Sequence, residues 1–421
     1  MSGKIVNNVF RASGVIAATP GGLDWSTAVV TGSTLSASAG KGYFINTTSN
    51  ACTVTLPSSA EIGDQIVFVD YARTWSTNNL IIDSNGNNFQ GSDDTYTVDY
   101  STAGQSLNIV YSDATKGWLP VSDDAVADVP VIPVTQKAIF AYGKTSGSVS
   151  MSNLVNSSGV IAADVSGVGT AREGLASVTY GNDKGLFAYG IASSSIVSMS
   201  NKVNTSGTVA ADVTGVGTAR TYLAGTTYGF DKGIFAYGYT GSNTNLSNLV
   251  SNSGVVAADT TGVGSARLLL AAARYGVGKA LFSFGRDAEV TNLVTDQGVI
   301  GSDVTGVGTE RNGLGASSYG DDKAIFAFGY SDGGGANTNV SNKVSNVGVV
   351  ASDTTGVGTA REQIGACSYG GDKGVFAYGF APGAARSMKN LVSNTGVVAA
   401  DVTGVGTARR FACGVGFSLS A

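Results

Sequence analysis

The chain has 421 residues, of which 60 are glycine, 43% are hydrophobic and 13% are charged, and its formal net charge is −5. This apolar fraction, without a long charged tract, excludes a disordered chain and is sufficient for a large core. The acidic balance argues against nucleic-acid binding, which requires a basic face. The sequence contains no histidine, so the commonest general base and the commonest metal ligand are both absent.

The N-terminal residues contain no apolar signal core, and no apolar run reaches membrane-spanning length. The run 268–273, for example, stops at Arg274. We therefore expect a protein that is assembled in the cytoplasm without membrane insertion. The three cysteines, Cys52, Cys367 and Cys413, form no CxxC pair and are expected to be buried free thiols.

The first part of the chain divides into an arm, a module and a linker. Residues 1–25 show little periodicity and are expected to form an N-terminal arm. Residues 26–120 are expected to form a small β-sandwich or β-roll, because short apolar runs alternate with turn-forming residues. The predicted strands are 42–45, 52–56, 64–70, 80–82 and 107–111. Residues 121–134 contain two prolines and are predicted to be a linker.

One pattern returns six times in the rest of the chain. Each copy holds an Asp eight residues before an Arg, and successive arginines are separated by 44 to 50 residues. The repeated positions are Asp164 and Arg172, Asp212 and Arg220, Asp259 and Arg267, Asp303 and Arg311, Asp353 and Arg361, and Asp401 and Arg409. Each repeat contains four short strand-like runs, which is typical of a propeller blade rather than of a solenoid. We therefore predict an all-β chain whose residues 135–421 form a six-bladed β-propeller.

The ends of this array are expected to complete one blade between them. The array starts with a middle strand, 137–143, and finishes with a first strand, 410–419. Pairing of these two segments would close the ring and remove an exposed sheet edge.

The recurrent Asp and Arg are expected to be structural, because an active site requires asymmetry and a sixfold repeated residue serves packing. Each Arg is expected to bridge neighbouring blades, with the Asp of its own or of the next blade as its partner. The repeated Gly-Val-Gly lacks the third glycine of a dinucleotide fingerprint and instead predicts a turn with positive φ. The acidic pairs Asp93-Asp94 and Asp321-Asp322 lack an EF-hand loop, and we predict no metal site and no cofactor.

All variation in repeat length falls in one connection per repeat. The spacings from Asn to Asp, from Asp to Arg and from Arg to Lys are constant, whereas Lys to Asn varies from 13 to 19 residues. The variable loops are 144–151, 191–199, 239–246, 286–290, 330–340 and 380–388. Variable loops on one face of a rigid scaffold are typical of a binding surface, although drift in unconstrained loops is an equally weighted explanation. The candidate binding residues are Tyr239, Arg286, Tyr330, Asp332, Phe380 and Arg386.

Two resemblances add to this interpretation. The segments GYFINTTSNACTVTLP, GDQIVFVDYARTWSTNNLII, GNNFQG and SLNIVYSDATKGWLPV resemble a module of fibre and other virion proteins of tailed bacteriophages. The repeat resembles the kelch pattern over residues 135–421, although its Gly-Gly pair is Tyr-Gly or Phe-Gly here and the kelch tryptophan is missing. The first resemblance implies a virion protein, a trimer, and attachment to other virion proteins through the N-terminal module.

Together these observations predict a non-enzymatic tail fibre or spike whose variable loops recognise a host-surface protein or glycan. A decorating or tail-stabilising protein without a receptor is the alternative. A glycan-cleaving enzyme is disfavoured, because no histidine is present and no single carboxylate pair stands out.

Overall fold

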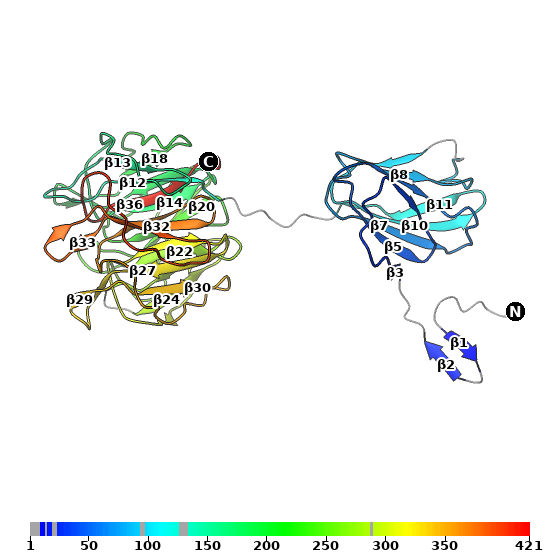
Figure 1. Ribbon diagram of the computed structural model, residues 1–421. Coiled ribbons are helices and arrows are strands. Elements are labelled where there is room, and N and C mark those ends of the chain that lie inside the picture. The colour runs from blue at the N-terminus through cyan, green and yellow to red at the C-terminus, as the bar shows by residue number, and fades with distance from the viewer. Residues whose placement is uncertain (1–8, 13–14, 19–22, 93–96, 126–133, 287–288) are drawn as a thin grey trace. The chain divides into compact units, whose positions relative to one another are not determined.

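The computed structural model describes residues 9–12, 15–18, 23–92, 97–125, 134–286 and 289–421. Every regular element in these residues is a β-strand, which confirms the all-β prediction. No helix that could cross a membrane occurs in these segments. The chain divides into two compact units, Met1–Pro130 and Val131–Ala421 (Figure 1).

The first unit contains two sheets. One has the strand order β11-β10-β7-β5-β3 and the other the order β4-β6-β8-β9. A separate hairpin pairs β1 with β2. The bounds are β1 Val9–Ala12, β2 Val15–Ala18, β3 Asp24–Trp25, β4 Thr34–Ser36, β5 Lys41–Ile45, β6 Cys52–Thr55, β7 Gln65–Asp70, β8 Leu80–Asp83, β9 Val98–Tyr100, β10 Ser106–Asp113 and β11 Gly117–Ser122. All five predicted strands are present.

The chain alternates between the two sheets from β3 to β8. Neighbouring strands within each sheet are therefore parallel, as β5 with β7 and β6 with β8, because the chain crosses to the other sheet between them. Side chains from both sheets fill a single core that includes Phe68, Ile109, Val54 and the fully buried Trp75. The alternating burial along β10 is the pattern of a strand with one face on a core.

The predicted boundaries of this module were too narrow. β3 pairs with β5, so residues 24 and 25 belong to the sheet rather than to the arm. β11 continues to Ser122, and Ser106 donates a backbone hydrogen bond to Asp124 at 3.1 Å. The reason is that the backbone N–H and C=O groups of strands at a sheet edge form hydrogen bonds with the chain segments that flank the sheet. Most of the predicted linker, residues 126–133, lies outside the described residues.

The second unit repeats one three-stranded plan six times. The sheets are β36-β12-β13, β14-β15-β18, β19-β20-β21, β22-β23-β24, β26-β27-β30 and β31-β32-β35, and the fourth also includes β25. The first strands are β14 Ala176–Tyr180, β19 Ala224–Tyr228, β22 Ala271–Tyr275, β26 Gly315–Tyr319, β31 Gly365–Tyr369 and β36 Cys413–Phe417. The middle strands are β12 Lys137–Ala141, β15 Lys184–Ala188, β20 Lys232–Ala236, β23 Lys279–Ser283, β27 Lys323–Ala327 and β32 Lys373–Ala377. The outer strands are β13 Ser152–Val155, β18 Ser200–Val203, β21 Ser247–Val250, β24 Val290–Val294, β30 Ser341–Val344 and β35 Lys389–Val392.

The strand predicted over the Gly-Val-Ile-Ala-Ala-Asp run, residues 159–164 in the first repeat, is wrong in all six repeats. These runs make only isolated bridges, such as Val155 to Ile161, and the short strand β25, Val304–Thr305, lies just after the run of its repeat. One apolar residue of the segment is buried, as Ile161 is at 2%, whereas the residue before it is exposed, as Val160 is at 55%. A single buried position gives too little buried face to stabilise an outer strand.

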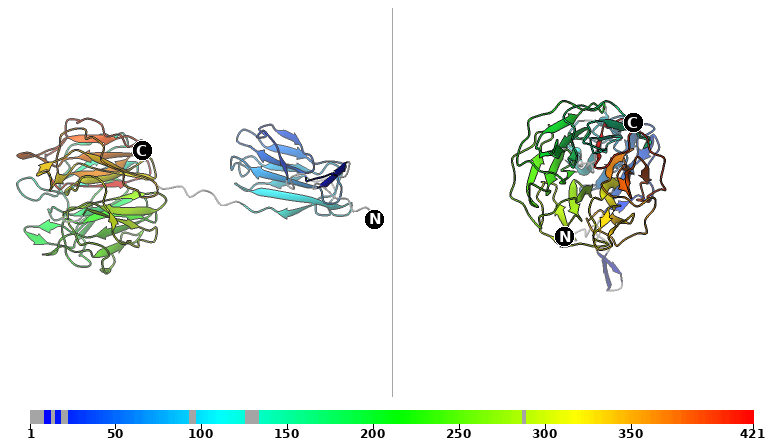
Figure 2. Two further views of the ribbon diagram at one scale, coloured as in Figure 1. Left: turned by 90° about the horizontal axis from the view of Figure 1, so that it is seen from below. Right: turned by 90° about the vertical axis from the view of Figure 1, so that its left-hand side faces the viewer.

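The predicted pairing of the two ends of this unit is confirmed. β12 and β36 are antiparallel neighbours, with Lys137 opposite Phe417 and Ala141 opposite Cys413. Each first strand contacts the first strand of the next sheet, and β36 contacts both β31 and β14. In the right-hand view of Figure 2 the sheets follow one another around a circle.

The core of the second unit lies between successive sheets. An aromatic residue at the end of each middle strand packs against a Phe in the next sheet, as Tyr142 does against Phe187 with ring centroids 5.5 Å apart. The same contact recurs between Phe328 and Phe376. Offset and edge-on aromatic pairs of this kind stabilise beyond their buried area.

Candidate binding site

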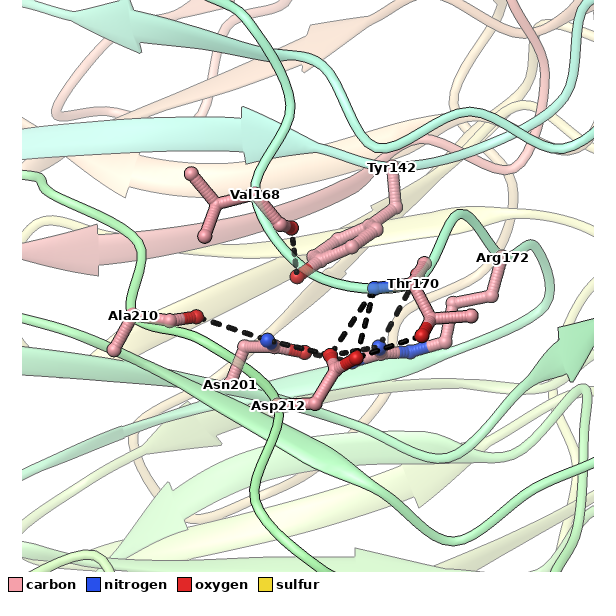
Figure 3. A network of polar contacts seen from close by, with 7 residues as sticks. All are labelled: Tyr142, Val168, Thr170, Arg172, Asn201, Ala210 and Asp212. Carbon is pink, nitrogen blue, oxygen red and sulfur yellow. Dashed lines mark hydrogen bonds and ion pairs between the residues drawn. The ribbon is translucent and has the colours of Figure 1, made fainter.

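Each repeated Arg lies in a buried polar network between two sheets, as Figure 3 shows for Arg172. Arg172 Nη2 donates to Asn201 Oδ1 at 2.5 Å, and its guanidinium lies 4.5 Å from the centre of the Tyr142 ring. Asp212 accepts hydrogen bonds from the backbone and the hydroxyl of Thr170, at 2.9 and 2.6 Å. The network therefore ties the segment that precedes the first strand to the outer strand of the same sheet and to the aromatic residue of the previous sheet.

Two residues in left-handed conformation shape this network. Tyr142 has φ 61°, and its ring is thereby placed under the guanidinium. Gly169, from the predicted Gly-Val-Gly turn, has φ 74°, and a Cβ there would lie 2.4 Å from Asp212 Oδ1. The positive φ predicted for this turn is confirmed, and only glycine fits beside the carboxylate.

The structure decides which Asp belongs to which Arg. Arg172 pairs with Asp212 at 3.5 Å, and Arg409 pairs with Asp164 at 3.9 Å across the β12–β36 closure. The Asp eight residues before an Arg is therefore not its partner. All six arginines are fully buried, and the other four are Arg220, Arg267, Arg311 and Arg361. The pairs Arg220–Asp259, Arg311–Asp353 and Arg361–Asp401 repeat the same ion pair. Asp303 instead accepts hydrogen bonds from Ser265 and Asn292, while Arg267 donates to the carbonyl of Phe284.

The charges in these networks are held by hydrogen bonds. Burial acts to raise the pKa of Asp212, but hydrogen bonds from Thr170 and Asn201 outweigh it and leave that pKa below its usual value. The pKa of Asp401 is lowered in the same way, against burial, by Thr359 and Asn390. Burial lowers the pKa of Arg361 to about 10, so this group stays charged at neutral pH. The repeated Asp and Arg thus stabilise the interior and leave no face of the guanidinium open to a ligand.

The six variable loops emerge at one end of the second unit. Each loop begins beside the residue that follows a repeated Arg, as the bridges Thr221 to Tyr239 and Asn312 to Tyr330 show. The corresponding bridges are Lys144 to Arg410, Glu173 to Ile191, Leu268 to Arg286 and Glu362 to Phe380. Three of the loops contain short hairpins: β16 Ile191–Ala192 with β17 Ser195–Ile196, β28 Tyr330–Ser331 with β29 Ala336–Asn337, and β33 Phe380–Ala381 with β34 Ala384–Ala385. We call this end of the unit the loop face.

The predicted binding residues stand around the loop face and do not form one pocket. Arg286 and Asp332 are exposed. Those that are half-buried are Tyr239, Tyr330, Phe380 and Arg386. Asp332 accepts a hydrogen bond from Asn312 Nδ2 at 2.8 Å, and Arg410 lies 5.1 Å from the centre of the Phe380 ring. These contacts join the loops to residues nearer the centre of the face.

A ring of six residues at the centre of the loop face was missed by the sequence analysis. It consists of the residue two positions after each repeated Arg: Gly174, Tyr222, Leu269, Gly313, Gln363 and Phe411. All six have φ between 54° and 65°, although four of them are not glycine. Each non-glycine residue in this region costs about 1 kcal/mol or more. We call these residues the mouth ring.

Backbone hydrogen bonds explain the unusual conformation of the mouth ring. Five bonds of 2.6 to 2.8 Å run from the N–H of one member to the carbonyl of the previous member. They are Tyr222 to Gly174, Leu269 to Tyr222, Gly313 to Leu269, Gln363 to Gly313 and Phe411 to Gln363. A positive φ is required to turn each N–H along the ring, and the bonds offset part of the strain.

The mouth ring surrounds a cavity of about 140 Å³ between the first strands. The Tyr222 ring lies over Gly174 and packs against the Phe411 ring, with centroids 5.3 Å apart and planes inclined by 41°. Leu269, Leu270 and Gly313 line another part of the cavity. The mouth is therefore aromatic on one side and aliphatic on the other.

Charged groups flank the aromatic side. Glu173 is 5% exposed and accepts from Lys144 Nζ at 2.7 Å through Oε1, while its Oε2 has no hydrogen-bond partner. Burial raises the pKa of Tyr222, with Glu173 raising it further and Arg410 lowering it. The site thus combines apolar rings with closely balanced charge.

Gln363 and the neighbouring Glu362 lie across the ring from Tyr222. Burial raises the pKa of Glu362, and a hydrogen bond from Gln363 acts in the opposite direction. The Gln363 amide nitrogen is thereby engaged, whereas its buried Oε1 has no partner. Gln363 lines the mouth cavity, so one unsatisfied acceptor remains there, and a second, on Glu173, lies next to the ring member Gly174 in the chain.

A signal for the mouth ring was present in the sequence. The position two after each Arg changes between Gly, Tyr, Leu, Gln and Phe, while the neighbouring Arg and the apolar residue that follows it are kept in type. Residue type thus varies at constant length here, whereas the loops vary in length, and a comparison of residue types between repeats identifies this position.

No cluster of three or more potential metal ligands occurs among the residues that the structure describes. Asp322 pairs with Lys323 at 2.7 Å, and Asp93-Asp94 lies outside the described segments. The three cysteines are free, as expected, although Cys413 is only half-buried.

No known protein family matches the chain, and no curated protein matches it significantly.

Proposed function

We propose that this chain is a virion protein of a tailed bacteriophage, a tail fibre or spike, and that its second unit recognises the host surface. In this proposal the six sheets are the blades of a closed six-bladed β-propeller. Its support is the contact of each first strand with the next and the pairing of β12 with β36. Six similar blades that close without a free edge form a rigid scaffold.

The first unit is the attachment module in this proposal. Its support is the resemblance of residues 42–121 to modules of phage fibre proteins. A trimer, bound to other virion proteins through this unit, is the expected assembly. Residues 1–125 produced alone should compete with the full chain for incorporation into particles, and competition by residues 134–421 instead would reverse the roles of the two units.

One observation carries the recognition role. All differences in length between repeats lie at the loop face, and the mouth ring, which differs in residue type, lies at the same face. The opposite end of the second unit is where its chain begins, because Gly371 after β31 donates to Thr135 at 3.1 Å. The variable end is thus distal to the point at which the chain enters the unit, which suits a surface that meets a receptor.

The test is the adsorption of phage particles to their host bacterium. Residues 330–340 are shortened to the length of loop 286–290, and the strands that flank this loop keep their register. The expected result is unchanged assembly and a changed adsorption rate. The matched control is Val255→Ser, an exposed position outside the loops, which should leave adsorption unchanged.

Particles with all six loops trimmed decide between the two functions. Normal adsorption and host range of such particles would contradict the receptor role and favour the decorating or tail-stabilising alternative. Immunogold labelling of intact particles locates the protein on the tail or on the capsid.

A further inference from the structure

We propose that the mouth ring binds one neutral hexose unit of a surface glycan. This inference rests on the proposed function of the loop face and names its ligand class. Tyr222 and Phe411 would form the apolar platform for the sugar ring, and Gln363 would accept a hydrogen bond from one of its hydroxyl groups.

The unsatisfied acceptor of the ring is the first support. Gln363 Oε1 is buried without a hydrogen-bond partner, and a buried polar atom in this state is costly unless a ligand or water satisfies it. Gln363 lines the cavity, and because its oxygen accepts hydrogen bonds, the complementary ligand must donate them, as a sugar hydroxyl group does.

The aromatic pair is the second support. The rings of Tyr222 and Phe411, 5.3 Å apart, are half-buried at the cavity rather than sealed in the core. An aromatic face next to polar groups suits a sugar, which has an apolar face of C–H groups and a polar rim. The cavity volume of about 140 Å³ is close to that of a cavity that accommodates one six-membered ring.

The charge balance selects a neutral sugar. Around the mouth, Glu173 and Glu362 are matched by Lys144 and Arg410, and Lys144 is already paired with Glu173. Asp332, on the neighbouring loop, adds a further negative charge. Among these five groups the negative charges outnumber the positive ones, so the carboxylate of an acidic sugar would be repelled.

The retained strain is the third support. Gly174 and Gly313 occupy the same backbone conformation without strain, so glycine would be the better residue at all six positions for stability alone. Large side chains at Tyr222 and Phe411 persist against this preference. Strain of this kind is found where a side chain is required for function.

The experiment is saturation-transfer NMR on the full chain with the methyl glycosides of glucose, galactose, mannose and N-acetylglucosamine. At least one glycoside is expected to bind. Tyr222→Gly and Phe411→Gly should each weaken its binding at least about tenfold. Both variants should still unfold cooperatively, because glycine adopts the native φ freely and this offsets part of the lost ring contact.

Phe230→Gly is the matched control. Phe230 is also an aromatic residue with positive φ, 71°, but it lines the cavity at the opposite end of the second unit. Its replacement should leave glycoside binding unchanged. The proposal is overturned if none of the four glycosides binds, or if both mouth variants bind as the parent does.

The two proposals fail in different ways. Absent glycoside binding with altered adsorption of loop-trimmed particles would reject the sugar site and leave the proposed function intact. The opposite outcome has two parts: Tyr222→Gly abolishes glycoside binding, but particles with this variant or with trimmed loops adsorb normally. This outcome would support the sugar site and reject host recognition.

Discussion

Two positions of the same repeat behave in opposite ways, although only one residue separates them. The Arg position is identical six times, fully buried, and joined to a neighbouring aromatic ring in every repeat. The mouth-ring position has one backbone conformation six times but five different residue types. The first position shows what is needed to hold adjacent sheets together. The second shows backbone geometry that is fixed by the fold and side chains that the fold does not dictate.

The comparison separates a position that stabilises the fold from one that the proposed recognition would use. A residue that serves the junction between sheets must satisfy the same geometry at every junction, so it repeats. A residue that serves a ligand on the symmetry axis has to break the symmetry, because the ligand itself is asymmetric. Substitutions at the two positions should therefore move different observables.

The largest effect is expected for Arg361→Ala. The change removes the bonds to Tyr378 O at 2.9 Å and Asn390 Oδ1 at 2.6 Å and leaves Asp401 without its cation. Truncation of one member of a buried charged network typically costs about 3–5 kcal/mol in the free energy of unfolding. Chemical denaturation checks this. Arg386→Ala, at a half-buried loop position, is the control and should cost less than about 0.5 kcal/mol. Equal losses of stability in the two variants would contradict the special structural role of the repeated Arg.

A smaller loss is expected for Gly169→Ala. The new Cβ would lie 2.4 Å from Asp212 Oδ1 and 2.6 Å from Asn201 Nδ2, in a residue with φ 74°. Strain and displacement of the carboxylate together should cost about 1–3 kcal/mol. The thermal midpoint should fall accordingly. Gly333→Ala provides the control, because its Cβ meets nothing within 4 Å.

The loss of folding stability at acidic pH should depend on the repeated aspartates. Asp401 has a lowered pKa in the folded protein, because hydrogen bonds outweigh its burial. The unfolded chain then binds the proton more readily, so this stabilisation is complete above the unfolded pKa of about 3.9 and is lost as the pH falls through the folded pKa. Asp401→Asn should cost about 1 kcal/mol at pH 7 and reduce the slope of stability against pH below about pH 4. An unchanged slope would contradict this role.

The smallest effect is expected at the mouth, and its sign is reversed. Gln363→Gly relieves a residue with φ 54° and removes a buried unsatisfied oxygen. The variant should gain about 0.5–1 kcal/mol, because the relief of strain exceeds the greater entropy of glycine in the unfolded chain. Differential scanning calorimetry measures the shift. A loss of stability comparable to that of Arg361→Ala would show that the mouth ring, too, serves the junctions.

The sequence by itself determined the all-β class, the six repeats, the strands after each Arg and each Lys, and the pairing of residues 137–141 with 413–417. These features depend on local alternation and on periodicity, which are visible without coordinates. The parallel pairing in the first unit was not determined, because alternation is the same in a parallel and in an antiparallel strand that has one face buried.

Only the tertiary structure decided the partners within the networks and the location of the mouth. Asp212 meets Arg172 although the nearer Arg in its own repeat copy is Arg220, because the strands β14, β15 and β18 bring the two ends of one sheet together. The mouth ring unites residues from Gly174 to Phe411, which no local pattern connects. Its members meet because six segments converge on one axis, and convergence is a property of the whole assembly of sheets rather than of any one repeat.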